Sequence, residues 1–462
     1  MPVRTHSELL PWLDRVAQGE ERVLVKERVR MLLETSGTTG RPKHLPVTRT
    51  WEETVQQAQR LWSLGLIRDH ADLSKGKLFT LVSPAVHGHS SGGLPIGSNT
   101  GRIRAAQPYW LRRRYAVPRD VMDIDDAIVR QYVALRFALV SDVRAITTAN
   151  PSLVLLLFRR LAEWREALSA DIRDGTVRSG PALDIRPSVR KKLERRLRAQ
   201  PIPKDWSPQA LWNLSSVNCW TGGPATFFAD RLRAVLDGVP VRELGVNASE
   251  GTFAIPLAND WPGSVLWVGG HLMEFIGSDG EPRWAWELEE GQHYRLVVTT
   301  SAGLWRYDME DLVEVVGFCE QTPLVRFVGK SGRFLNAVGE RVTAAQVSAA
   351  MVKIKGGIDG FTVGVKMGDV PRYVIAFEGK SSGSAVAETF DLALSNLNVE
   401  YESKRKSGRL GVPEWCVLPS GHYTRYRAQR LAEGAPDGQL KDPVLAINAV
   451  EWERVVQGEG EQ

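Results

Sequence analysis

Hydrophobic and polar residues at the front of the chain change from helical to extended spacing. The opening residues up to about Gly19 have the apolar spacing of an amphipathic helix, whereas "VRMLLE" and "KHLPVT" are typical of strands. A second helix is predicted from about Trp51 to Leu64. The stretch "ETSGTTGRPK", Glu34 to Lys43, lies between the two extended runs. We therefore predict that it is a loop that joins two strands.

The central part of the chain has a long helical pattern followed by many short strand patterns. From about Ile124 to Ser169, apolar residues recur at helical spacing, which predicts helices that form core. From Val217 to Val328 the pattern changes to short apolar runs separated by Gly, Pro and Asp. The two patterns together predict a large α/β domain whose second half is rich in strands.

Beyond about Leu335 the pattern starts again. A helix is predicted over 344–354, followed by the strands "FTVGVKM" and "RYVIAFEG", a helix over about 385–397 and the strand "EWCVLP". Roughly 120 residues are enough for an independent unit. We predict two domains, a large one over residues 1–335 and a smaller one over residues 336–462.

The composition excludes several classes of protein. The chain has 462 residues, of which 43% are hydrophobic, so it can bury a large core. Its net charge of only +5 predicts no nucleic-acid partner, and the strongest apolar run, "LVLLLF", is far shorter than the roughly 18 residues that span a bilayer. Cys219, Cys319 and Cys416 are far apart and lack metal-site spacing. We expect a cytoplasmic monomer without a membrane partner.

The loop "ETSGTTGRPK" has the residue types of a phosphate-binding loop. Two glycines allow close backbone approach, four residues carry hydroxyl groups, and Lys43 supplies a positive charge. It is not a P-loop, because only two residues separate its glycines and a strand pattern follows instead of a helix. The alternative is a hairpin turn without a ligand, and the loop alone does not decide between the two.

Longer stretches resemble a known family. "TSGTTGRPK" looks like the phosphate loop of the acyl-adenylate-forming superfamily. Tyr294 to Phe318, together with "LVRFVGK" and "GERVTAAQV", resembles the Gretchen Hagen-type acyl acid amido synthetases, which include auxin- and jasmonate-conjugating enzymes. The resemblance implies an α/β fold with a large multilayer N-terminal adenylate-forming domain. This domain would contain β-sheets with flanking helices and a small β-barrel, followed by a smaller, mobile α/β C-terminal domain.

The resemblance also implies an activity. A carboxylic acid would react with ATP and Mg²⁺ to give an acyl-adenylate, and an amine, expected to be an amino acid, would then take the acyl group to form an amide. Two alternatives stay open, namely a ligase that forms a thioester with CoA or a carrier protein, and a nucleotide-binding homologue without turnover.

The family's roles can be carried over to single residues of this chain. Lys43, Glu250 and Lys441 would be catalytic: Lys43 adds charge near the phosphates, Glu250 is the metal ligand, and Lys441 neutralises charge on the α-phosphate. Asp311 would accept hydrogen bonds from the ribose hydroxyls. The other nucleotide-binding residues would be Thr35, Ser36, Gly37, Thr38, Thr39, Gly40, Thr221, Gly222, Gly223 and Ser249.

One motif departs from the family pattern. The family's Tyr-Arg-x-Gly-Asp is Tyr307-Asp308-Met309-Glu310-Asp311 in this chain, so an acid replaces the Arg and another replaces the Gly. Two added negative charges beside an anionic ligand are electrostatically unfavourable. This departure is the reason for keeping the alternative without turnover.

Three further patterns have competing interpretations. "GHSSG" matches G-x-S-x-G, so Ser90 with His271 or His293 would suit a hydrolase, but "GLPIGSNTG" does not predict the helix that this motif needs. His87 and His89 lack a third metal ligand and are expected on a surface loop. The basic stretch 186–200 has one apolar stripe, which favours an ordinary amphipathic helix over a nucleic-acid or membrane contact.

Overall fold

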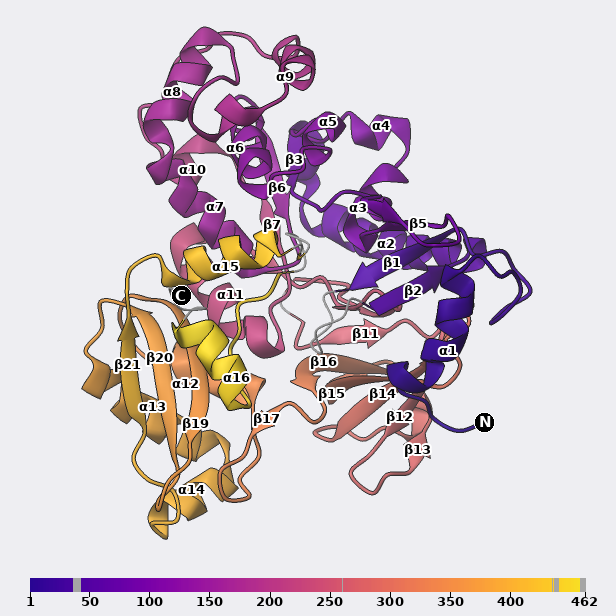
Figure 1. Cartoon of the computed structure of the whole chain (residues 1–462), viewed down its shortest axis with the longest axis vertical. Coiled ribbons are helices and arrows are strands. Elements are labelled where there is room, and N and C mark those ends of the chain that lie inside the picture. Colours follow the sequence, from indigo (N-terminus) through magenta and orange to yellow (C-terminus); the bar gives the residue numbers. More distant parts are fainter. Residues whose placement is uncertain (36–42, 260, 434, 436–439, 458–462) are drawn as a thin grey trace.

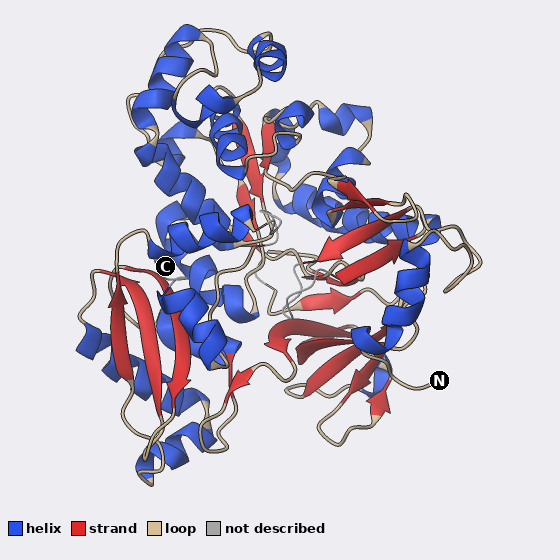
Figure 2. Ribbon diagram, in the orientation of Figure 1, coloured by secondary structure: helices blue, strands red, loops and turns tan. Residues whose placement is uncertain are grey.

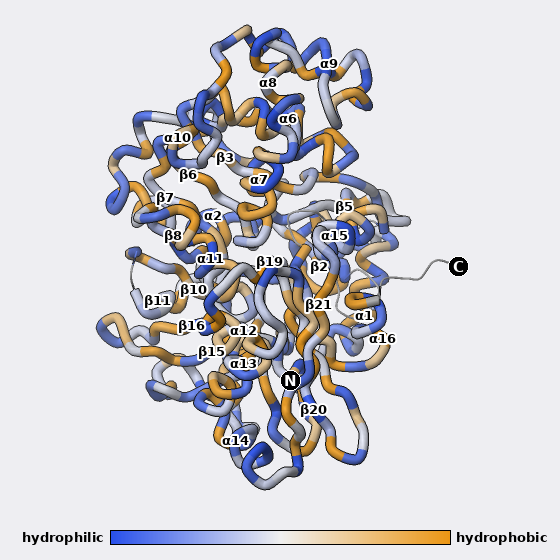
Figure 3. The backbone as a smooth tube through the Cα atoms, turned by 90° about the vertical axis from the view of Figure 1, so that its left-hand side faces the viewer, coloured by the Kyte–Doolittle hydropathy of each residue, from blue (hydrophilic) through white to orange (hydrophobic). Residues whose placement is uncertain are grey.

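The computed structural model describes residues 1–35, 43–259, 261–433, 435 and 440–457 (Figure 1). Helices and strands alternate through most of the chain, and several separate sheets are visible (Figure 2). In Figure 3 the backbone changes between hydrophobic and hydrophilic colours within most elements, as expected for elements with one buried and one exposed face. The structure confirms the predicted α/β class.

Four parallel strands form a sheet within the N-terminal domain. Their order is β3-β6-β7-β8, with bounds β3 (Lys77–Thr80), β6 (Val143–Thr147), β7 (Ser216–Asn218) and β8 (Val241–Arg242). Helices α6 (Ala127–Ala138), α7 (Pro151–Glu163), α8 (Arg165–Asp174) and α11 (Thr226–Leu236) supply buried side chains to this part of the protein.

The prediction of one helical block from about residue 124 to 169 is wrong, because strand β6 interrupts it. Val143, Ala145 and Ile146 are each 2% exposed or less. A strand that is buried on both faces has a nearly continuous apolar sequence, which periodicity does not separate from a buried helix. The block therefore consists of α6, β6, α7 and α8.

A second sheet contains the strands on either side of the predicted loop. Its order is β2-β1-β5-β4, with β1 (Met31–Thr35), β2 (Lys43–Val47), β4 (Gly88–His89) and β5 (Pro95–Gly97). β1 and β2 are antiparallel, and Thr35 lies opposite Lys43. This pairing confirms that strands flank the loop, whose residues 36–42 lie outside the described part of the chain. Helices α1 (His6–Ala17) and α2 (Arg49–Asp69) pack against this sheet.

The strand-rich half, where a small β-barrel is expected, forms an eight-stranded sheet. Among the described residues no pairing joins its two outer strands, so closure into a barrel stays a prediction. The order of the sheet is β13-β12-β14-β15-β16-β11-β10-β9. Its strands are β9 (Val246–Asn247), β10 (Thr252–Ile255), β11 (Ser264–Leu266), β12 (Leu272–Ile276), β13 (Pro282–Arg283), β14 (His293–Thr299), β15 (Tyr307–Cys319) and β16 (Thr322–Lys330). All its pairings are antiparallel.

The C-terminal domain has its own sheet, and its core also includes Phe227 and Phe228 of α11 from the N-terminal domain. Strands β19 (Ile358–Lys366), β20 (Arg372–Gly379) and β21 (Glu414–Leu418) pack with α12 (Ala344–Val352), α13 (Gly383–Leu397), α14 (Val399–Lys406) and α15 (His422–Ala432). The two-stranded pair β17 (Phe334–Leu335) and β18 (Val342–Thr343) precedes them. The boundary between residues 335 and 336 stays a prediction.

The remaining α-helices are short. They are α3 (Asn99–Ala105), α4 (Tyr109–Arg112), α5 (Arg119–Met122), α9 (Pro187–Glu194), α10 (Pro208–Leu211) and α16 (Ala449–Trp452). Within the described ranges, we find no helix with the length and apolar character needed to traverse a lipid bilayer.

Candidate functional site

An ion pair between neighbouring strands marks the centre of the candidate site. Asp311 of β15 lies opposite Lys330 of β16, and the Lys330 ammonium donates to Asp311 Oδ1 over 2.6 Å. Lys330 Nζ also donates to the carbonyl oxygen of Met309 over 2.7 Å. Burial would lower the pKa of Lys330, but the carboxylates of Asp311 and Glu250 outweigh it, so this pKa is raised. The sequence interpretation missed Lys330, although it ends the quoted strand "LVRFVGK".

A tight turn brings Glu250 to the same place. Ala248 and Gly251 exchange backbone hydrogen bonds of 2.9 and 3.3 Å, and the indole of buried Trp51 donates to the Glu250 carbonyl over 2.7 Å. Burial raises the pKa of the Glu250 carboxyl, with Asp311 acting in the same direction, while Lys330 and Lys43 oppose the shift. The structure thus brings Lys43, Glu250 and Asp311 within electrostatic reach of each other.

The C-terminal tail delivers a third cation to this cluster. Lys441 Nζ lies 4.9 Å from the centre of the Trp220 ring, a cation-π distance. Lys441 is exposed to solvent, yet desolvation by the surrounding protein lowers the pKa of its ammonium. Asp311 opposes this shift and Lys330 strengthens it. Lys441 therefore belongs to the same site, although it is 130 positions beyond Asp311 in the sequence.

The predicted segment Thr221 to Gly223 is held by a carboxylate that the sequence interpretation missed. Glu243 Oε2 accepts hydrogen bonds from the Thr221 amide over 2.7 Å and from its hydroxyl over 2.6 Å. Gly223 has a φ of +56°, which favours glycine, and a side chain there would meet the Val328 carbonyl. Burial raises the pKa of Glu243. These contacts place the segment against β16.

Of the other predicted residues, some lie at the site's edge and some lie outside the described residues. Thr35 ends β1, and Ser249 lies in the turn with Glu250. The loop residues Ser36, Gly37, Thr38, Thr39 and Gly40 are not described. Next to Thr35, Glu34 contacts His44 and His87, whose hydrogen bonds lower the pKa of this carboxyl to about 2.

Asp308, the acid that stands where the family has an arginine, is buried and paired with a cation. Its side chain is 5% exposed and forms an ion pair with Arg295 of β14. Asp308 Oδ1 also accepts the Glu310 amide hydrogen over 2.9 Å. The negative charge is therefore compensated within the sheet, which weakens the electrostatic argument for a homologue without turnover.

The second unusual acid, Glu310, occupies a conformation that favours glycine. It is exposed and has a φ of +58°, and glycine is the residue that the family resemblance places there. We expect Glu310→Gly to raise the free energy of unfolding by about 1 kcal/mol, because glycine adopts a left-handed φ without strain. Chemical denaturation measures the change. Glu310→Ala is the control, and an equal gain with alanine would assign the effect to the lost charge instead of the backbone.

The alternative hydrolase site is rejected. Ser90 and Leu94 exchange hydrogen bonds in a turn that leads into β5, instead of the helix that a nucleophile motif needs. His271 is only 6% exposed, and burial lowers its pKa to about 4. His293, in contrast, is exposed on β14.

A magnesium ion fits the site only as part of a metal-nucleotide complex. Among the described residues, no group of three or more His, Cys, Asp or Glu side chains is arranged to hold a metal ion. Mg²⁺ is commonly bound by one or two carboxylates together with substrate phosphates. Glu250 alone satisfies that requirement if the nucleotide supplies the other ligands.

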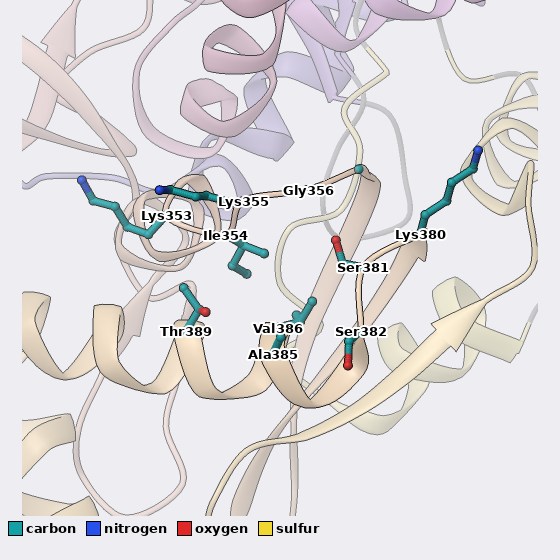
Figure 4. A pocket seen from close by; sticks show the side chains of 11 residues that line it. Lys353, Ile354, Lys355, Gly356, Lys380, Ser381, Ser382, Ala385, Val386 and Thr389 are labelled. Atoms are coloured by element: carbon teal, nitrogen blue, oxygen red, sulfur yellow. The ribbon is translucent and has the colours of Figure 1, made fainter.

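A groove in the C-terminal domain is separate from this cluster. It has a volume of about 490 Å³ and lies between the end of α12 and the start of α13. In Figure 4 the side chains of Lys353 and Lys355 extend to one side and that of Lys380 to the other, so the three ammonium groups do not converge. We do not include the groove in the site.

Comparisons with known proteins cover nearly the whole chain. The model of the GH3 family N-terminal domain matches residues 1–241, that of the central domain residues 264–330, and that of the C-terminal domain residues 341–449. A jasmonoyl-L-amino acid synthetase of Nicotiana attenuata is 24% identical, over 96% of this chain and 84% of that protein. An indole-3-acetic acid-amido synthetase of Arabidopsis thaliana is also 24% identical, over 97% of this chain and 85% of that protein.

A solved structure shares the fold. The GH3.15 acyl acid amido synthetase superimposes with a TM-score of 0.84 at 20% identity, over 98% of this chain and 86% of that chain. These matches confirm the family resemblance and the fold class that the sequence predicts.

Proposed function

The chain belongs to the GH3 family, and from this premise we propose that it is an ATP-dependent acyl acid amido synthetase. The observation that carries the proposal is the position of Lys441, whose ammonium lies 4.9 Å from the centre of the Trp220 ring and within electrostatic range of Asp311 and Lys330. A tail lysine beside a carboxylate and a second cation suits a nucleotide whose phosphates gain charge during reaction.

In the first half-reaction, a carboxylate oxygen of the acid attacks the α-phosphorus of ATP. The bond from this phosphorus to the pyrophosphate breaks, and the products are an acyl-adenylate and pyrophosphate. In the second half-reaction, an amine nitrogen attacks the acyl carbon, the bond to AMP breaks, and the nitrogen loses a proton to solvent. The products are an amide and AMP.

The residues of the site are assigned roles that follow from their chemistry. Asp311 would accept hydrogen bonds from the ribose hydroxyls, with Lys330 holding its carboxylate in place. Lys43 and Lys441 would stabilise the negative charge on the phosphates. Glu250 would bind the Mg²⁺ of the nucleotide, and that ion would neutralise phosphate charge. Thr221, Gly222 and Gly223 would border the nucleotide, in the position set by Glu243.

The acid and amine are proposed from the named relatives. Jasmonic acid and indole-3-acetic acid occur in the names of similar proteins, and 2,4-DB occurs in a complex of GH3.15. We propose that this chain takes an acid of the same kind and an amino acid as the amine. It would act as a monomer, because one chain supplies all residues of the site.

The test is ATP-pyrophosphate exchange with jasmonic acid, indole-3-acetic acid, 2,4-DB and octanoic acid. Exchange above background with at least one acid, followed by amide formation when amino acids are added, is the expected result. Background exchange with every acid would contradict adenylation and favour a homologue without turnover. A product that forms only when CoA is added would favour a thioester ligase.

A further inference from the structure

Both neighbours of Lys441 in the chain are linked to the start of α7, a helix of the N-terminal domain: Leu440 directly, and Asp442 through Arg427. The Asn150 side-chain amide donates to the Leu440 carbonyl over 2.8 Å. On the other side of the lysine, Asp442 accepts a hydrogen bond of 2.8 Å from Arg427 of α15. The same Arg427 nitrogen donates to the Ser152 hydroxyl over 2.9 Å. In Figure 1, α15 lies beside α7.

These contacts are shielded from water. Asn150, Ser152 and Arg427 are 9% exposed or less, and so is the Asp442 side chain. Hydrogen bonds and ion pairs are stronger where water is excluded, and removing one partner leaves the other unsatisfied. Each contact therefore favours one position of the tail over others.

The Asn150 side chain forms a hydrogen bond with the tail and does not cap its own helix. It occupies the N-cap position of α7, where asparagine commonly accepts a hydrogen bond from the first turn. Its side chain makes no such capping bond within the described residues. The amide group is directed to the Leu440 carbonyl, so replacing it removes a contact between the domains without removing a cap.

The tail is also attached to its own domain, on the far side of the lysine. Val363 of β19 donates to the Val444 carbonyl and accepts from the Ala446 amide, each over 2.9 Å. The Thr362 hydroxyl donates to the Pro443 carbonyl over 2.6 Å. Lys441 thus lies on a short segment with one attachment to the N-terminal domain and one to the C-terminal domain.

We propose that Asn150, Ser152, Arg427 and Asp442 form a latch that positions Lys441 for adenylation. The latch residues do not touch the reacting atoms, and they act by fixing the backbone on both sides of the lysine. The inference rests on the proposed function, because it assigns the lysine to the first half-reaction. It adds four positioning residues from two parts of the chain, residues 150–152 and residues 427–442.

The test uses the double variant Asn150→Ala/Ser152→Ala, which removes the two hydrogen bonds from the start of α7 and leaves the buried Arg427–Asp442 pair intact. We expect the maximal exchange rate to fall by roughly 10- to 100-fold, the range for losing two buried hydrogen bonds of which one involves a charged donor. The KM for ATP should change by less than about threefold, because the ribose contact is retained.

A double-mutant cycle separates positioning from general structural damage. If the latch acts through Lys441, the same two substitutions in a Lys441→Ala background should change exchange by less than about twofold. An equal further loss in that background would overturn the proposal, and so would unchanged exchange in the double variant. Arg231→Ala is the matched control, because Arg231 and Asp359 also join the domains, over 2.8 Å, but are partly exposed. It should retain exchange within about twofold.

Hydrogen exchange by mass spectrometry gives a readout that needs no acid. In the double variant, the peptide covering residues 440–446 should take up deuterium faster than in the wild type, while peptides of β20 and β21 remain unchanged. If the wild type shows no ATP-pyrophosphate exchange, the proposed function fails, and the deuterium uptake still reports whether the latch holds the tail. Unchanged uptake would overturn the latch itself.

Discussion

A Lys441→Ala variant is expected to lose about 10²- to 10³-fold of the ATP-pyrophosphate exchange rate, the usual effect of removing one preorganised charge-stabilising group. Negative charge builds up around the α-phosphorus as the acid attacks, and Lys441 is the cation that the tail brings to the Trp220 ring, within electrostatic range of Asp311. Binding of ATP should change much less, because the lysine acts most strongly on the charge that develops in the transition state.

The control for this variant is a lysine that lies outside the site. Lys406 of α14 is 74% exposed and pairs with Glu402, so Lys406→Ala should retain the wild-type rate. Full exchange activity in Lys441→Ala would remove the lysine from the mechanism.

The pH dependence of the same reaction tests the protonation state of Lys441. Desolvation favours the neutral amine and lowers its pKa, so the wild-type rate should fall as the pH rises through that value. Arginine keeps its charge to higher pH. The Lys441→Arg variant should therefore lose less of its own maximal rate at alkaline pH than the wild type does. Parallel profiles for the two proteins would assign the alkaline decline to another group.

Glu250→Gln is the second substitution with a large expected effect. Glutamine keeps the shape of the side chain and removes the charge that would bind the metal of the nucleotide. We expect exchange at a fixed magnesium concentration to fall by about 10²-fold, and the magnesium concentration for half-maximal rate to rise by about tenfold. Both quantities come from exchange assays over a magnesium series.

Glu310 provides the control for the loss of one negative charge without the loss of a metal ligand. It is exposed on β15, and its carboxylate also interacts electrostatically with Lys330. Glu310→Gln should keep the magnesium dependence of the wild type. An unchanged magnesium dependence in Glu250→Gln would mean that Glu250 does not bind the metal, even if its rate falls.

The parts of the site that could be predicted from sequence are those carried by local motifs. The strands around "ETSGTTGRPK" follow from the apolar runs on either side, and the pairing of Thr35 with Lys43 agrees with that prediction. Glu250, Asp311 and Lys441 each stand in a short motif that resembles the family's. The structure adds that their charges influence one another.

The missed residues depend on strand register and on contacts between distant segments. Lys330 meets Asp311 because of the pairing of β15 with β16, which shifts register next to Leu312. Sequence periodicity predicts the strands but not this register. Arg427 meets Ser152 across 275 positions, and no local pattern signals such a contact. The sequence did not predict strand β6 for another reason. The apolar pattern of a strand that is buried on both faces cannot be told from that of a buried helix by periodicity.

The attachment of the tail to β19 has a consequence for the solubility of the protein. β19 is the outer strand of its sheet in the pairing order β19-β20-β21, and backbone groups of Val363 are satisfied by Val444 and Ala446. An uncovered edge strand can pair with another chain and lead to aggregation. Deleting the tail would therefore expose this edge as well as remove the lysine. We therefore expect the segment that carries Lys441 to limit self-association through this edge as well.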